Sequence, residues 1–308
     1  MYLPKALTVI AAGELYADLI MSGFDFWPAP GREAFAREFH REIGGGAAIT
    51  ACGLARLGTR TGLLGVVGED GEWLTGQLRK HRVDVSDVRT DASEPTGFTV
   101  AVTSPADRAF FTYPGANRGF PAALAEAAAA KHLSGVTHVH LAFAPELNTA
   151  AALFLAIRGN GCTVSLDVGW HEDWLADPRA LAALHWIDIL FPNETEAARL
   201  TGEDDPEKCL RRMGEAGLKR VALKLGERGA ALLWDGRILF EAAHAVTPLD
   251  TTGAGDSFDA GFLHAWLKGK RPEESLRTAN ICGALSTEKH GGISGFPDTA
   301  RLKALVEA

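Results

Sequence analysis

A glycine-rich segment that ends in an acid, DTTGAGDSF at residues 250–258, has the residue types that phosphoryl transfer requires. Gly253 and Gly255 lack a Cβ, so the backbone can turn sharply there and its amides can approach a ligand. Apolar residues recur at helical spacing from Asp256 onward, which predicts that this loop enters a helix N-terminus. Such a terminus attracts phosphate through unpaired N–H groups and the helix dipole. A carboxylate beside it can take a proton from the attacking group while the amides hold the transferred oxygens.

An aspartate in the first turn of a helix also occurs for stability alone. The match here is longer, because DTTGAGDSF resembles over its whole length the C-terminal signature of the ribokinase-like (PfkB) carbohydrate kinases. The resemblance implies that Asp256 is the general base and that the amides of Gly253, Ala254 and Gly255 form an anion hole. It also implies transfer from ATP, with Mg²⁺ on the nucleotide, to a hydroxyl of a small sugar or sugar-like substrate.

Two N-terminal motifs resemble the substrate side of the same family. Asp18 follows Gly13 by five residues, as in the family's first-strand motif, which implies that it accepts substrate hydroxyls; a solvated loop acid is the alternative. Gly44 and Gly45 match the N-terminal signature, in which small residues let backbone amides reach the substrate; a helix-entry turn is the alternative. Many sugar-specific relatives carry an asparagine where this chain has Ile49. Isoleucine offers no hydrogen bond, so we expect ribose and fructose to be poor substrates and Asp18 to carry more of the recognition.

Shorter motifs imply two cation sites. Asn193 and Glu196 resemble the family's N-x-x-E motif, which implies that they hold Mg²⁺ through its waters, since Mg²⁺ prefers oxygen ligands and keeps much of its hydration. A capping box at the start of a helix is the alternative, and it does not exclude the metal. Asp250 and Thr252, together with the turn at residues 289–295, resemble the site where many relatives bind K⁺.

Other short motifs imply nucleotide contacts. The segment KLGERG at residues 224–229 ends an expected strand with a glycine turn and resembles the family's nucleotide-side loop. By that resemblance, Lys224, Gly226 and Gly229 contact ATP. Asn280 falls where relatives line the adenine pocket.

Composition limits the classes of function. The chain has 308 residues, a formal net charge of −8 and a pI near 5.7, which disfavours nucleic acid or an anionic membrane as a partner. Its four cysteines are scattered, so neither a zinc site nor a disulfide framework is expected. His138 and His140 alternate along one expected strand, where satisfied histidines are far commoner than metal ligands. We find no signal-peptide pattern and no apolar run of about 20 residues, and therefore expect a cytoplasmic protein.

Alternating strands and helices predict the fold. Apolar runs separated by helical patterns imply right-handed crossovers and a doubly wound, mostly parallel α/β sheet covered by helices. Ligands bind such sheets beyond the carboxyl ends of the strands. The expected strands are 7–12, 61–67, 136–141, 163–167, 187–191, 220–225, 230–234 and 237–241, and the expected helices include 47–57, 69–81, 149–160, 194–201 and 206–216.

Two inserted segments show a different pattern from the rest of the chain. Residues 14–42 and 97–114 alternate as edge strands do, the second around the turn 104–107. We expect them to form a small β-sheet lid on a single ribokinase-like domain spanning residues 1–308, and this lid could also join two copies of the chain in a homodimer. A lid would exclude water from the site.

Motifs of other kinase and dehydrogenase classes are missing. The chain has no G-x-x-x-x-G-K-[ST] segment, no protein-kinase signature pair and no dinucleotide fingerprint after the first strand. Two alternatives to a sugar kinase stay open at this point. One is a nucleoside kinase of the same fold, and the other is a non-catalytic sugar- or nucleotide-binding protein.

Overall fold

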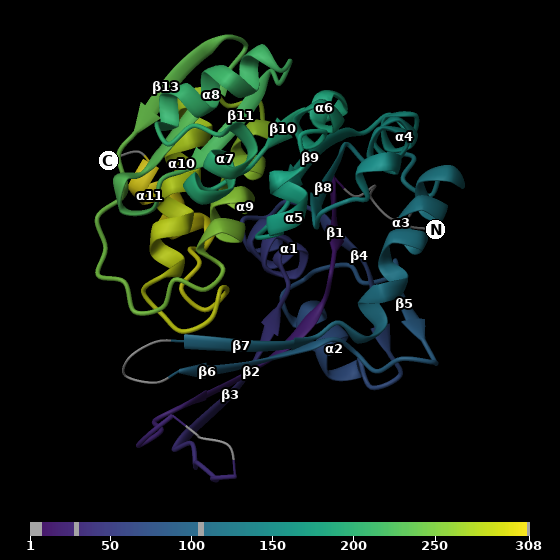
Figure 1. Cartoon of the computed structure of the whole chain (residues 1–308), viewed down its shortest axis with the longest axis vertical. Helices are drawn as coiled ribbons and strands as arrows, with labels where there is room; N and C mark the ends of the chain where they lie inside the picture. The colour runs from purple at the N-terminus through teal and green to yellow at the C-terminus, as the bar shows by residue number, and fades with distance from the viewer. Residues whose placement is uncertain (1–7, 28–30, 104–107, 307–308) are drawn as a thin grey trace.

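The main element is a nine-stranded sheet in the order β13-β12-β11-β10-β9-β8-β1-β4-β5 (Figure 1). The computed structural model describes residues 8–27, 31–103 and 108–306. Neighbouring strands run parallel from β5 to β11, and β12 and β13 add an antiparallel edge, which confirms the expected mostly parallel sheet. The strands are β1 Val9–Gly13, β4 Thr61–Gly68, β5 Val88–Asp91, β8 His138–Ala142, β9 Thr163–Asp167, β10 Ile189–Leu190, β11 Arg220–Lys224, β12 Ala230–Trp234 and β13 Arg237–Glu241.

Helices cover both faces of this sheet. Side chains alternate between the faces along each strand, so Ile10 and Ala12 join one core cluster while Val9 and Ala11 join the clusters on the other side. One face packs on α3 Phe120–Ala129, α4 Leu147–Arg158, α7 Glu194–Thr201 and α8 Pro206–Glu215. The other packs on α1 Gly46–Arg56, α2 Glu72–Lys80, α9 Ala254–Leu267, α10 Pro272–Ser286 and α11 Thr299–Val306.

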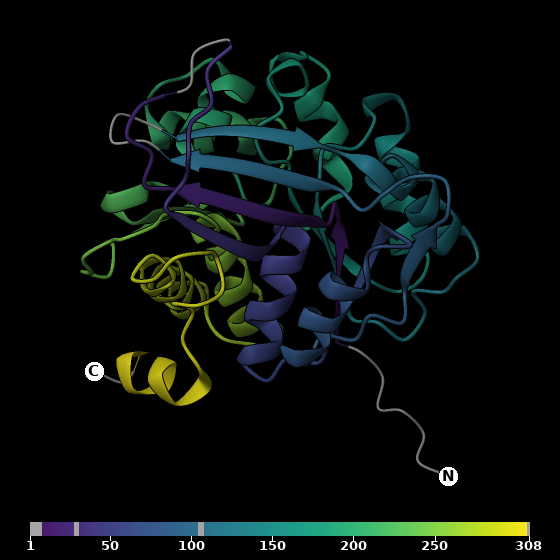
Figure 2. The same ribbon diagram turned by 90° about the horizontal axis from the view of Figure 1, so that it is seen from below.

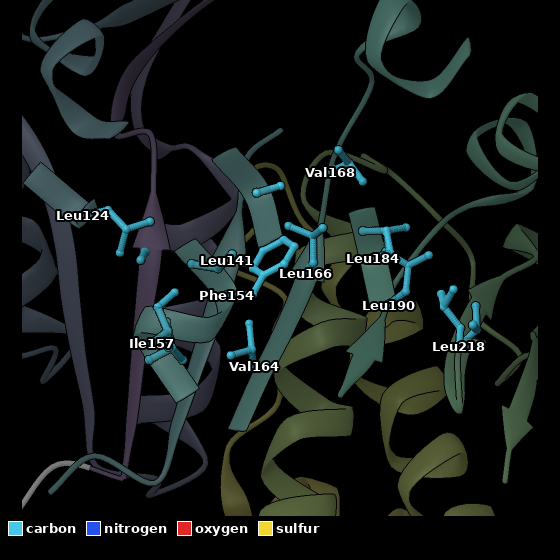
Figure 3. Packing of buried hydrophobic residues seen from close by; sticks show 14 of the residues in the cluster. Leu124, Leu141, Phe154, Ile157, Val164, Leu166, Val168, Leu184, Leu190 and Leu218 are labelled. Atoms are coloured by element: carbon cyan, nitrogen blue, oxygen red, sulfur yellow. The ribbon is translucent and has the colours of Figure 1, made fainter. Parts of the chain in front are cut away.

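The first core cluster is continuous under the strands that carry the site (Figure 3). Phe154, Val164 and Leu166 are fully buried there, and a buried side chain of this size contributes about 1.5–3 kcal/mol to folding. This packing fixes the ends of β8 and β9, from which polar side chains project. Among the described residues, no helix is long and apolar enough to cross a membrane.

A separate four-stranded sheet, in the order β3-β2-β6-β7, lies beyond the end of β1 (Figures 1 and 2). Its strands are β2 Tyr16–Ser22, β3 Glu38–Gly44, β6 Phe98–Thr103 and β7 Arg108–Tyr113, and they come from the two segments expected to form the lid. Buried Asn117 fixes the link from β1, because its side chain accepts a hydrogen bond from the amide of Leu15 (2.8 Å) and donates one to the Leu15 carbonyl (2.9 Å). The expected turn at residues 104–107 lies outside the described residues.

Several element boundaries differ from expectation. Helix α2 begins at Glu72, because residues 68–71 form a turn closed by the Gly71 amide and the Gly68 carbonyl (3.0 Å). The strand expected at 187–191 is reduced to β10, since the Asp188 side chain accepts a hydrogen bond from the amide of Val164 (2.8 Å) beside it. The structure adds β5 and the short helices α5 Glu172–Ala176 and α6 Ala180–Ala183, which are too short to show a periodic pattern.

Candidate active site

A cavity of about 480 Å³ opens where β1, β8, β9 and β11 end. It joins motifs from four distant parts of the sequence, as expected for the carboxyl edge of a parallel sheet. Its lining includes Glu14, Gly46, Ala142, Phe143, Asp167, Trp170, His171, Asn193, Glu196, Lys224, Gly226, Thr251, Gly253, Ala254, Gly255 and Asp256.

Asp256 lies in the first turn of α9, as the sequence predicts. The helix begins at Ala254, and its N-cap residue, Gly253, has a φ of 71°, in the left-handed region that favours glycine. Burial raises the pKa of Asp256 to about 7, and the negative charge of Asp167 adds to the rise. The ammonium of Lys224 opposes it. A carboxyl with a pKa near neutrality can both accept and release a proton under ordinary conditions.

Close packing sets the position of this carboxyl group. A Cβ at Gly46 would lie 2.7 Å from Oδ1 of Asp256, so only glycine leaves room for the side chain. Thr50 on α1 donates a hydrogen bond to the Asp256 carbonyl (3.2 Å), which ties the start of α9 to α1. Gly46 is a residue that the sequence reasoning missed, although its place directly after the Gly-Gly pair was a usable signal.

The glycine loop in front of Asp256 faces the cavity. Ala254 donates its amide to the carbonyl of Thr251 (3.2 Å), so this N–H already has a partner. The anion hole that the resemblance implies would therefore use the amides of Gly253 and Gly255. Gly253 also packs tightly, since a Cβ there would lie 2.6 Å from Cα of Gly292.

Lys224 lies deeper in the site than its assignment to the nucleotide loop suggested. Its ammonium donates to Oδ2 of Asp167 (2.6 Å) and lies 3.5 Å from Oδ1 of Asp259. Burial alone would lower the pKa of Lys224, but the charge of Asp167 holds it above the ordinary value. A Cβ at Gly255 would lie 3.4 Å from this nitrogen, so the ammonium stands beside the glycine loop.

Carboxylate oxygens of Asp167, Asp256 and Asp259 lie within 4.8 Å of one another, a spacing that metal ligands also show. The ammonium of Lys224 already stands among them and supplies the positive charge that such a cluster needs. Burial would raise the pKa of Asp167, but the ammonium of Lys224 keeps it below the ordinary value. The cluster is therefore an ion-pair network around a lysine.

Asp18 and Gly44 lie together on the small sheet. A Cβ at Gly44 would stand 2.1 Å from Oδ1 of Asp18, so the glycine makes room for this carboxylate. Asp18 is paired across the strands with Glu42, and both side chains point to the same face. Burial first, and Glu42 second, raise the pKa of Asp18 to about 6. Gly45 has a φ of 94°, and a Cβ there would meet the Glu14 carbonyl.

Asn193 and Glu196 form the capping box of α7. Asn193 accepts from the Glu196 amide (2.9 Å), and Glu196 accepts from the amide and the side chain of Asn193 (2.8 and 2.7 Å). Both residues line the cavity. Because both carboxylate oxygens of Glu196 already accept hydrogen bonds, they fit a hydrated Mg²⁺ better than direct coordination.

The residues expected to bind nucleotide occupy two places. Gly226 lines the main cavity, whereas Asn280 lines a separate pocket of about 270 Å³ with residues 241–244. Asn280 donates to the carbonyls of Glu241 and Ala242 (3.1 and 3.2 Å) and so fixes that wall. Gly229 turns the chain between the two places, with a φ of 99° and no space for a Cβ beside the Glu241 carbonyl.

Asp250 ties two loops together behind the glycine loop. Its carboxylate accepts from the amides of Thr252 and Gly291 (3.0 Å each), and the side chain is almost fully buried. The structure thus brings Asp250 and Thr252 next to the turn at residues 289–295. Ile49 is buried and packs against Gly253 and Gly292.

His138 and His140 are buried in the core with side-chain hydrogen-bond partners on β9. The expectation that they are satisfied strand residues agrees with the contacts of His138, whereas Nε2 of His140 has no hydrogen-bond partner among the described residues. In the loop after β9, Trp174 donates to the Pro145 carbonyl (2.7 Å), whereas Trp170 is 55% exposed at the cavity. Packing therefore accounts for Trp174 and leaves Trp170 available to a ligand.

Comparison with known proteins agrees with this arrangement. The model of the pfkB family of carbohydrate kinases matches residues 8–299. A ribokinase of Arabidopsis thaliana is 31% identical over 97% of this chain and 81% of its own length, and an ATP-dependent ribose-1-phosphate kinase of Halopiger xanaduensis is 32% identical over 93% and 94%. The structure of Arabidopsis thaliana ribokinase complexed with ribose and ATP superposes with a TM-score of 0.84 at 28% identity, over 98% of this chain and 99% of that one. The chain belongs to the pfkB family and is a carbohydrate kinase.

Proposed function

We propose that this kinase transfers the terminal phosphoryl group of ATP to a hydroxyl of a small neutral sugar, with Asp256 as general base. The observation that carries the proposal is the position of a half-buried carboxyl of pKa about 7 beside the glycine loop, in a cavity that reaches the ends of four strands. Asp256 takes the proton of the attacking hydroxyl. The amides of Gly253 and Gly255 stabilise charge on the transferred group.

The nucleotide is proposed to extend from this cavity toward the pocket beside Asn280. Gly226 lines the main cavity, and Asn280 lines the separate pocket. If the phosphates of ATP bind in the main cavity, the adenine lies near the separate pocket. Asn193 and Glu196 would hold Mg²⁺ through its waters, and the ion would neutralise charge on the phosphate oxygens. Asp250 and Thr252 would hold K⁺ behind the glycine loop, so activity should be higher in K⁺ than in a bulky organic cation at equal ionic strength.

We propose that the substrate end of the site lies at the small sheet, where two acids, Asp18 and Glu42, share one face; neither lines the main cavity itself. Like charges repel, so a carboxylate or phosphate on this end of the substrate would be unfavourable. This argues against a sugar acid as the substrate. A neutral polyhydroxylated substrate donates hydroxyl protons to both acids without that penalty.

The deciding experiment is a coupled assay of ADP release over a panel of sugars, sugar acids and nucleosides. Ile49 is buried against glycine backbone and gives no hydrogen bond, so we expect ribose and fructose to show kcat/KM below the ~10⁴–10⁸ M⁻¹s⁻¹ of well-matched enzymes. Binding of a sugar without any turnover would support the non-catalytic alternative. Turnover of nucleosides alone would support the nucleoside kinase.

Asp18 should bind substrate only as the carboxylate. Below its pKa of about 6 it becomes protonated, so KM for the sugar should rise as pH falls through 6. Asp18→Asn should raise KM by about 10–100-fold, the value of a hydrogen bond to a charged group, and remove this dependence. Glu42→Gln removes the neighbouring negative charge and should move the KM midpoint to lower pH. A KM that stays constant between pH 5 and 7 in the wild type would contradict this role.

The small sheet is also proposed to join two copies of the chain. Leu19, Met21, Phe39, Val100 and Phe111 share the face opposite to Asp18, and Phe39 and Phe111 are about 60% exposed. Arg41 also lies on this face, opposite Leu19, but its other residues named here are apolar. An exposed apolar sheet face marks an interaction surface. Sedimentation should show a dimer, and Phe39→Ser with Phe111→Ser should yield monomers; a monomeric wild type would refute the proposal.

A further inference from the structure

A chain of buried polar side chains leads from the core to the floor of the site. His138 contacts Thr163 (2.8 Å) and Ser165 (2.7 Å), and Ser165 in turn contacts Nδ1 of His140 (2.9 Å). Nε2 of His140 faces Oδ2 of Asp259 at 4.0 Å, and both side chains are fully buried. Neither of these two atoms has a hydrogen-bond partner among the described residues.

The donors and acceptors along this chain favour one arrangement of the protons. The Thr163 hydroxyl lies 3.2 Å from the Thr137 carbonyl, and when it donates to that carbonyl it accepts from Nδ1 of His138. Burial lowers the pKa of His138 far below the ordinary value, so the ring is neutral and its Nε2 accepts from Ser165. Ser165 has then used its hydrogen and accepts from Nδ1 of His140. Burial also lowers the pKa of His140, to about 4, so its Nε2 presents a lone pair to Asp259.

Asp259 therefore needs a proton. An ionised carboxylate would face a lone pair at 4.0 Å, and both side chains are fully buried. A charge count agrees that one of three neighbouring carboxyls carries a proton, because one ammonium, Lys224, cannot compensate three ionised carboxylates within 4.8 Å of each other. Asp259 is the one of the three that is fully buried. Burial raises the pKa of Asp259 well above the ordinary value, in agreement.

We propose that Asp259 is a positioning residue that works as an uncharged acid. It accepts a hydrogen bond from the ammonium of Lys224 without neutralising the positive charge. Lys224 then contacts the transferred phosphoryl group as a cation. The inference rests on the phosphoryl transfer proposed above. Asp167 supplies the one full counter-charge at 2.6 Å, and Asp259 supplies a neutral acceptor at 3.5 Å. The third N–H of Lys224 is left for a phosphate oxygen, beside the Gly255 loop.

An anionic Asp259 would give a different site. Two carboxylates on Lys224 would cancel its attraction for phosphate and would add negative charge close to Asp256. The charges around Asp256 set its pKa. The titratable groups that face it are Asp167 on β9, Glu196 on α7, Lys224 on β11 and Asp259 on its own helix.

Infrared spectroscopy tests the proton directly and without substrate. A protonated carboxyl has a C=O stretch distinct from that of a carboxylate. At pH 8, above the pKa of Asp256, the wild type should show one such buried band, which Asp259→Asn removes and Asp256→Asn retains. Absence of the band in the wild type, or its persistence in Asp259→Asn, would overturn the inference.

Kinetics tests the role of the uncharged acid. The amide of Asp259→Asn accepts from Lys224 as the protonated acid does, and it points an N–H toward His140 where the acid has its O–H. The value of kcat should therefore fall by less than about tenfold, and the midpoint of its acid limb should stay in place. Asp259→Ala should lower kcat about 10²-fold with little change in KM for ATP, because Lys224 loses its orientation. Lys224→Met should lower kcat by about 10²–10³.

A shift of the midpoint of the kcat–pH curve to lower pH in Asp259→Asn would mean that the substitution had removed a negative charge. This result would refute the proposal that Asp259 is uncharged. A wild type that phosphorylates nothing in the panel would instead refute the proposed function, and with it the role of Lys224, whatever the infrared band shows. The two failures are therefore distinguishable.

Discussion

Asp256→Asn is expected to lower kcat by about 10²–10⁴, the usual contribution of a general base, while the affinity for ATP stays nearly unchanged. Asparagine keeps the size of the side chain in the space beside Gly46 but cannot take the proton of the attacking hydroxyl. Single-turnover rates and a separate ATP titration measure the two quantities. A variant with near-wild-type turnover would remove Asp256 from the mechanism.

The same residue should set the pH dependence of the wild type. Asp256 must be ionised to act as a base, and its pKa is raised to about 7, first by burial and second by Asp167. The value of kcat should therefore fall tenfold per pH unit below about 7. In Asp256→Asn this acid limb should disappear from whatever activity is left.

The stability that Asp256 contributes should fall as pH rises, whereas the activity should increase. The folded-state pKa of Asp256 lies above its ordinary value of 3.8, so the folded state binds the proton more tightly than the unfolded chain. The stability contributed by this proton is complete below about pH 4 and is lost as pH rises through 7. Asp256→Asn should therefore unfold at a higher temperature than the wild type at pH 8, and the difference should shrink at pH 5. A lower Tm at pH 8 would contradict burial as the cause of the raised pKa.

The second large effect is expected from Gly46→Ala. The added methyl would lie 2.7 Å from Oδ1 of Asp256 and 3.3 Å from Cβ of Ala142, so the short aspartate side chain must rotate away. A displacement of about 1 Å at a reacting group can cost 10²-fold, and kcat should fall by about that factor. Alanine favours the helix as strongly as any residue, so the Tm should change little.

Gly76→Ala is the matched control, because Gly76 is also helical and a Cβ there would meet nothing within 4 Å. This change should leave kcat as it is and raise stability by about 0.5–1 kcal/mol. If Gly46→Ala keeps kcat within about threefold of the wild type, the methyl does not displace Asp256 and the geometric argument fails.

The sequence by itself determined the order of elements and the motif residues. Long apolar runs such as residues 61–67 and 163–167 predict buried parallel strands, because only a doubly covered sheet buries both faces. DTTGAGDSF predicted the helix N-terminus at Asp256, since glycine turns and helix starts are local in sequence. The two segments of the small sheet were also visible, as alternation has a short period.

Only the tertiary structure decided which of these residues come into contact and which of the carboxyl groups are protonated. Lys224 was assigned to a nucleotide loop, but the parallel pairing of β9, β10 and β11 places it against Asp167, 57 residues away. Asp259 reads in the sequence as one more polar position on a helix. Its burial against Lys224 and His140 comes from the packing of α9 on β8 and β11, and burial in a low dielectric is what makes the protonation of a carboxyl depend on its neighbours.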